Sequence, residues 1–253
     1  MPSYIGHITT AKLLLSRLNI SHEDQIKFII GNIVPDIKQV DIDYTLDEFV
    51  NKKNIQKSKR VTHFRKNTNK ILEYPHLRIF LEKYREDSKE HIETFAYLFH
   101  LYTDHYYFKF FLPKVIKFYN YEMEEVDERD NFYYVKILKN NKILKAKTFF
   151  SKLSSQGLYK EYARSDSFLI NKFHLNINVD ILRRYVKKYS YNCYIEEIKI
   201  TKIYDVFDKI ERILKNKTSD EMMVFEPDDL EKFVVDVVDS FCEEYSDLIN
   251  NYL

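Results

Sequence analysis

The chain has 253 residues, 45% of them hydrophobic, which is enough to bury a substantial core in one large domain or two small ones. Its 40 Lys and Arg side chains balance 39 Asp and Glu side chains, so the net charge of +1 gives no sign of a nucleic-acid or anionic-membrane partner. The two cysteines have no metal or redox spacing, and the N-terminus has no secretory pattern. No apolar run approaches the roughly 20 residues that cross a bilayer. These features predict a cytoplasmic protein without a transmembrane segment.

The first hundred residues are expected to be mainly helical, because glycine and proline are scarce and apolar residues recur three or four positions apart. The first helix is expected over about 9–18, with Thr9 or Thr10 as its N-cap. The second begins after Ser21, an N-cap followed by acidic residues, and ends near Val34 because a proline follows. A polar loop over about 38–59 comes next.

The central part of the chain combines a helical pattern with a segment that fits strands as well. A long helix is expected from about 89 to 112, and the very acidic segment 121–130 indicates a solvated connector. Segment 132–150 fits either a hairpin around Asn140 and Asn141 or another helix. Further helices are expected at 158–173, 178–189, 200–216 and 227–251.

The histidines are concentrated in the first 105 residues, and one pair has a spacing that carries chemistry. His100 and Asp104 are four residues apart, so on a helix they project from one face about one turn apart. Their segment is apolar on most sides, which predicts burial, and an unpaired buried carboxylate costs several kcal/mol. A metal cation would supply the missing partner. The alternative is a His–Asp pair that satisfies itself without an ion. His105 lies about 100° further round the helix and faces elsewhere.

Three other side chains have settings that suit metal ligands. Asp36 follows a proline at a helix end, His63 lies in a short Thr-His-Phe motif, and His7 follows a glycine and directly precedes the first expected helix. Other histidines, His22, His76 and His91, are interpreted as surface residues because charged or turn-forming residues flank them.

The order and spacing of four short motifs resemble the zinc-dependent phospholipase C family and its relatives among helical nucleases of the S1/P1 type. The motifs fall within about residues 5–113 and are Gly6-His7, Gly31-Asn32-Ile33-Val34-Pro35-Asp36, Thr62-His63-Phe64 and His100-Leu101-Tyr102-Thr103-Asp104. The resemblance implies a helical bundle around a cluster of ions. It assigns Asp36, His63 and His100 to one ion, and it makes Asp104 a bridge to a second ion that His7 also binds.

Two departures from the family limit the expected site to one or two ions. Secreted members use a free N-terminus as a ligand after signal removal, and this chain shows no signal. Members also take a third ion from two further histidines and a glutamate, whereas only His174 follows His105 here. Histidine and carboxylate ligands suit zinc, and manganese or iron remain open because no thiolate selects zinc.

The expected activity is hydrolysis of a phosphoester by a metal-activated water, with a small phosphoester or a phospholipid head group as substrate. Asp36 or Asp104 would accept the proton, as catalytic residues. Phosphate oxygens could be met by Arg60, Arg65 or Lys66, which flank His63, although a basic loop is more often only solvated.

The expected fold class is all-α, a multi-helix bundle of the phospholipase C/P1 nuclease type, with a small hairpin insertion near 132–150 as an option. Residues 1–120 would form a helical metal-binding core, 121–150 a charged connector or insertion, and 151–253 a helical C-terminal part packed on the same domain. The sequence leaves the oligomeric state open.

Two other functions fit parts of this pattern. A non-catalytic helical protein could keep a structural or vestigial metal site. A phosphohydrolase of the HD type also uses His and Asp on helices, but it needs His followed directly by Asp, and this chain has only the reversed pair Asp104-His105.

Overall fold

The structure is a computed structural model that describes residues 3–37, 61–65, 73–127, 132–151, 153–189, 194–198 and 200–253. The polar loop expected over 38–59 therefore lies outside the described residues. The described helices are α1 (Tyr4–Leu15), α2 (His22–Ile33), η1 (Val34–Asp36), α5 (Leu77–Tyr84), α6 (Asp87–Glu90), α7 (Ile92–Tyr106), η2 (Tyr107–Phe111), α8 (Leu112–Val115), α9 (Ala146–Phe149), α10 (Leu158–Lys172), α11 (Val179–Tyr189), η3 (Ile200–Lys202), α12 (Ile203–Lys215), α13 (Pro227–Glu244) and α14 (Ser246–Ile249).

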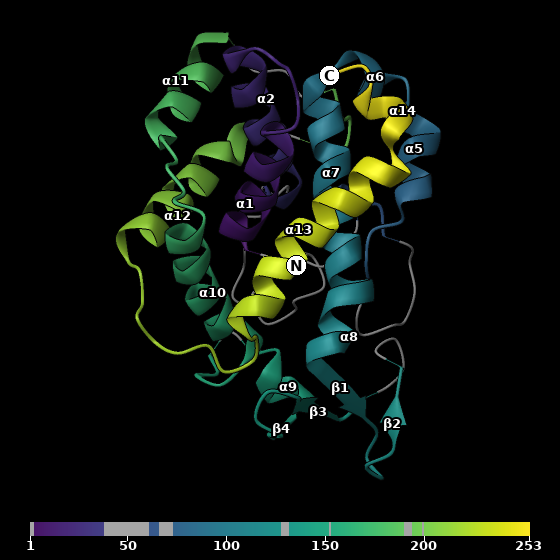
Figure 1. Ribbon diagram of the computed structural model, residues 1–253, viewed down its shortest axis with the longest axis vertical. Coiled ribbons are helices and arrows are strands. Elements are labelled where there is room, and N and C mark those ends of the chain that lie inside the picture. The colour runs from purple at the N-terminus through teal and green to yellow at the C-terminus, as the bar shows by residue number, and fades with distance from the viewer. Residues whose placement is uncertain are drawn as a thin grey trace, which may run out of the picture.

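Helix α7 is the central element, and α2 packs along it (Figure 1). Apart from Glu93, every residue of α7 from Ile92 to Asp104 is buried. Gly31 lets the two backbones touch, since a Cβ at this position would lie 2.5 Å from the carbonyl oxygen of Glu93. This close approach sets the end of α2, and the η1 turn that follows it, beside the middle of α7.

Helix α1 begins earlier than the sequence pattern predicts. Its N-cap is Ser3, whose hydroxyl accepts a hydrogen bond from the Gly6 amide and donates one to Asp166 on α10. The hydroxyls of Thr9 and Thr10, the expected caps, instead donate to backbone carbonyls three or four residues earlier in the same helix. The prediction that His7 precedes the helix is therefore wrong, because His7 lies in its first turn.

The C-terminal helices cover two sides of this centre. In Figure 1, α10, α11 and α12 lie together on one side of α1, and α13 crosses in front of α1 and α7. Helix α13 buries an apolar stripe against them, formed by Leu230, Phe233, Val234, Val237, Val238 and Phe241. The helix expected over 227–251 is interrupted at Tyr245, after which the short helix α14 follows.

The all-α prediction is wrong, because four antiparallel strands form a small sheet at one end of the molecule (Figure 1). The strands are β1 (Ile116–Tyr119), β2 (Glu125–Val126), β3 (Tyr134–Ile137) and β4 (Ile143–Lys145), in the order β2-β1-β3-β4. Pairing sets Phe118 opposite Val135 and Ile116 opposite Ile137, so the inner face is apolar.

The sheet has a local and a non-local origin. Its β3–β4 hairpin occupies the segment where a hairpin was one of two options, and Asn141 adopts the left-handed conformation that such turns need, with φ of 57°. Strand β1 was not predicted, because its main partner, β3, lies beyond the acidic segment in the sequence. Strand β2 forms within that segment, which was expected to be only a connector.

No helix in the described part of the chain is long and apolar enough to cross a membrane.

Candidate metal centre

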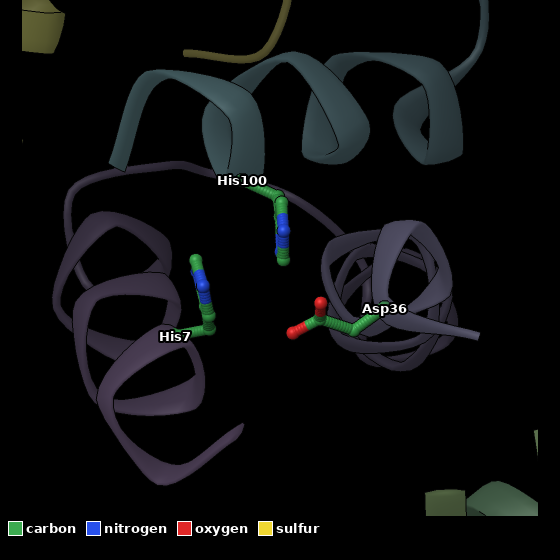
Figure 2. A group of neighbouring side chains, drawn as sticks. All are labelled: His7, Asp36 and His100. Atoms are coloured by element: carbon green, nitrogen blue, oxygen red, sulfur yellow. The ribbon is translucent and has the colours of Figure 1, made fainter. Parts of the chain in front are cut away.

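The five predicted ligands are brought together at the centre of the helical part. His7 comes from α1, Asp36 from the η1 turn after α2, His63 from the short segment 61–65, and His100 and Asp104 from α7. His7, His63, His100 and Asp104 are fully buried, and Asp36 is 7% exposed. Figure 2 shows His7, Asp36 and His100 pointing toward one another from three separate helical elements.

His63 lies at the centre of one half of the cluster. Its Nε2 atom is 3.5 Å from Asp36 Oδ1, 3.4 Å from Asp104 Oδ2 and 3.4 Å from His100 Nε2. This single nitrogen therefore faces both carboxylates and a second imidazole. A cation among these atoms would have nitrogen and oxygen ligands on several sides.

His7 closes the other half of the cluster. Its Nε2 atom lies 3.3 Å from Asp104 Oδ1, and its ring stacks on that of His100 with 3.8 Å between the centroids (Figure 2). The ligand atoms form two groups, and within each group they lie within 4.8 Å of one another. The first group is His7, Asp36 and His100, and the second is His63, His100 and Asp104, so His100 belongs to both. The family resemblance implies a different division, in which His7 shares an ion with Asp104 rather than with Asp36.

Hydrogen bonds from neighbouring groups orient two of the imidazoles. The Nδ1 atom of His100 is 2.7 Å from the carbonyl oxygen of Asn32, which makes Nδ1 the donor and leaves the Nε2 lone pair facing the cluster. The Nδ1 atom of His63 is 2.9 Å from the hydroxyl oxygen of Thr62. The backbone of Thr62 is itself held, because its carbonyl accepts a hydrogen bond from Tyr97 on α7. Neither Asn32 nor Thr62 was predicted as a partner of these imidazoles, although each lies in a motif of the resemblance.

Burial and neighbouring charge keep the cluster in a ligand-competent protonation state. Burial lowers the pKa of His63 and holds that of His100 well below its ordinary value, so both rings are neutral near pH 7. Burial alone would raise the pKa of Asp104, but its contact with the His7 imidazole outweighs burial and holds the pKa below the ordinary value. A neutral imidazole and an ionised carboxylate are the forms that bind metal ions.

Several buried atoms of the cluster lack hydrogen bonds, which tests whether a metal fits. Among the described residues, neither ring nitrogen of His7 and neither carboxylate oxygen of Asp104 makes a hydrogen bond. Each such atom costs about 1–3 kcal/mol when left unsatisfied. A cation with its bound water would satisfy them, and the donor set of imidazole and carboxylate suits zinc, manganese or iron. The residues present therefore fit a metal site.

A permanently charged side chain also borders the cluster. The Nη2 atom of Arg65 lies 3.9 Å from Asp104 Oδ2, and the Arg65 side chain is only 15% exposed. Arg60 and Lys66, the other two basic residues considered from the sequence, lie outside the described residues.

Two further histidines and the tyrosine of the His100-Asp104 motif take no part in the cluster. His105 faces away as expected, with Nδ1 3.1 Å from the carbonyl oxygen of Pro75, and His174 is exposed in a turn. Tyr102 packs in the core against Phe241. A hollow of about 650 Å³ beside His105 is lined by none of the five cluster residues.

No protein-family model, no curated protein and no solved structure matches the chain. The geometry of the cluster and the motifs of the sequence are therefore the observations that bear on function.

Proposed function

We propose that this chain is a metal-dependent phosphoester hydrolase whose one or two ions, with zinc as the first candidate, are bound by His7, Asp36, His63, His100 and Asp104. The observation that carries the proposal is the convergence of these side chains from separate elements, together with the buried atoms of His7 and Asp104 that lack hydrogen bonds. The resemblance of the motifs to zinc-dependent phospholipase C supports the same chemistry.

A bound ion would lower the pKa of a coordinated water toward neutrality and offset the negative charge of a phosphoester. Asp36 or Asp104 would accept a proton from that water. Substrate would be a small phosphoester or a phospholipid head group.

A structural metal site is the second candidate, and the depth of the cluster favours it. His7, His63, His100 and Asp104 are each fully buried, whereas a catalytic metal needs a position open to substrate. The ligand set would be the same in both cases. The two candidates therefore differ in activity and not in metal content.

The first experiment is elemental analysis of tag-free protein purified without chelator, compared with a folded His100→Ala/Asp104→Ala double variant. His105→Ala is the matched control, because it removes an imidazole from the same helix that faces away from the cluster. We expect one or two equivalents of zinc, manganese or iron in the wild type and in the control, and none in the double variant. No metal in the wild type after incubation with excess ions would refute the metal site.

The second experiment separates catalysis from a structural role. The metal-loaded protein is assayed with bis(p-nitrophenyl) phosphate before and after removal of the ions by a chelator. Hydrolysis that is lost with the metal and restored by adding it back supports the hydrolase. A metal-loaded protein without activity on phosphomonoesters, phosphodiesters or phospholipids would favour the structural site.

A further inference from the structure

His7 differs from the other two imidazoles of the cluster in how its ring is held. The Nδ1 atoms of His100 and His63 each have a polar neighbour that orients the ring, at 2.7 and 2.9 Å. Neither ring nitrogen of His7 makes a hydrogen bond among the described residues. Its ring stacks on that of His100, but stacking leaves the ring free to turn within its own plane. The direction of the His7 ring therefore depends on the backbone that carries it.

That backbone belongs to the first turn of α1, which is built on Ser3. The amide of His7 donates to the Ser3 carbonyl at 3.0 Å, and the amide of Gly6 donates to the Ser3 hydroxyl at 3.1 Å. The first amides of a helix have no partner within the helix, so the N-cap residue determines where the first turn lies. A displacement of Ser3 would therefore be passed on to His7.

Ser3 is in turn tied to α10, which lies beside α1 (Figure 1), by the carboxylate of Asp166. Asp166 is 3% exposed, and Ser3 is the one hydrogen-bond partner of its side chain among the described residues. Burial raises the pKa of Asp166 to about 7, and the hydrogen bond from Ser3 offsets this only in part. For stability alone, an apolar side chain of the same size would cost less to bury. The contribution of Asp166 is therefore to fix Ser3 relative to α10.

We infer that Asp166 is a positioning residue of the metal centre, which acts through Ser3 to hold the first turn of α1 where the His7 ring meets the cluster. The inference rests on the proposed function, because it concerns the metal that His7 would bind. Asp166 itself belongs to neither group of ligand atoms. Its effect on the ion is thus indirect and passes through a serine hydroxyl and one turn of helix.

The test compares zinc affinity, from a competition titration, with histidine side-chain NMR of the zinc-loaded protein, which records each imidazole separately. Asp166→Leu and Ser3→Ala remove the hydrogen bond, and Asp166→Asn keeps an acceptor oxygen. We expect the first two variants to weaken zinc binding about 10-fold and to move the His7 signal toward that of a free imidazole, with the His63 signal in place. Asp166→Asn should retain the wild-type affinity and spectrum.

A double variant and a matched control show whether the effect passes through the one hydrogen bond. Ser3→Ala/Asp166→Leu should bind zinc no more weakly than Ser3→Ala alone, because both substitutions remove the same interaction. Ser165→Ala is the control, since it removes a buried hydroxyl from the same helix that donates only to the Glu161 carbonyl one turn earlier. It should match the wild type in both measurements.

Metal content is measured on every sample first, so that two failures stay distinct. A wild-type protein that takes up no metal refutes the proposed function, and the inference falls with it. In a metal-loaded protein, wild-type zinc affinity of Asp166→Leu and Ser3→Ala overturns the inference alone. A change in the His63 signal as large as that of His7 also overturns it, because Asp166 would then serve general packing. If Asp166→Leu does not fold, Ser3→Ala, which leaves α10 unchanged, decides by the same criteria.

Discussion

Acidification of the metal-free protein should lower its stability through His100. The ring is fully buried, and burial holds its pKa well below the ordinary value, so the folded protein keeps it neutral. In the unfolded chain the same imidazole has a pKa of about 6.5. The pKa of His100 is thus lower in the folded protein than in the unfolded chain. The contribution of neutral His100 to the free energy of unfolding is therefore complete above about pH 6.5 and is lost as the pH falls below that value.

The size of the effect follows from the proton that only the unfolded chain takes up. Between pH 7.5 and pH 5.5, protonation of one such imidazole in the unfolded state lowers the free energy of unfolding by about 1.4 kcal/mol. His100→Gln removes this contribution while keeping a donor for the carbonyl of Asn32. We therefore expect the loss of stability between the two pH values to be smaller by about 1.4 kcal/mol in the variant than in the wild type.

The assay is urea unfolding with a chelator present at both pH values, followed by circular dichroism. His22→Gln is the matched control, since it removes an exposed imidazole at the start of α2, outside the cluster. A His100→Gln variant that loses as much stability as the wild type between pH 7.5 and 5.5 would refute the reasoning.

Three further changes test the supports of the cluster. Thr62→Val removes the hydroxyl that lies beside Nδ1 of His63 and orients its ring. This change should weaken zinc affinity about 10- to 100-fold in a competition titration. Thr94→Val is the control, because it removes a buried hydroxyl that makes no hydrogen bond among the described residues, and it should leave zinc affinity unchanged. Equal effects of Thr62→Val and Thr94→Val on zinc affinity would contradict the orienting role of Thr62. Gly31→Ala forces a Cβ to 2.5 Å from a carbonyl oxygen of α7 and should cost about 1–3 kcal/mol in urea unfolding; a variant as stable as the wild type would disprove the close approach. Phe64→Ala should cost about 3–5 kcal/mol by the same measurement and also weaken zinc binding, because Phe64 adjoins His63; a loss well under 1 kcal/mol would show that the ring does not hold the segment 61–65 in place.

Much of the helical structure was predictable because its signals are local. Ser21 caps α2 as expected, with its hydroxyl accepting from the Asp24 amide, and the helices expected at 158–173 and 178–189 correspond to α10 and α11. The four-residue spacing of His100 and Asp104 likewise predicted that both would project from one face. Such features depend only on residues within a few positions of each other.

The errors arise where distant residues compete with a local signal. Thr9 and Thr10 have the side chains of helix caps, but Ser3 caps α1, and its hydroxyl also donates to Asp166 on α10, more than 150 residues later in the sequence. Strand β1 forms because it pairs with β3, which lies beyond an acidic segment in the sequence. The prediction of an all-α fold was therefore wrong. Neither partner is visible in a local window of the sequence.

The sequence by itself determined the chemistry available to this protein: which imidazoles and carboxylates are present, and that His100 and Asp104 share a helix face. The motifs implied that His7, Asp36 and His63 join them, and only the tertiary structure decided how the ligand atoms divide into groups and that Arg65 faces the same carboxylate. The physical reason is that local spacing sets the direction of a side chain within one helix. The distances between side chains of different elements depend on how closely those elements pack, as the contact of α2 with α7 at Gly31 illustrates.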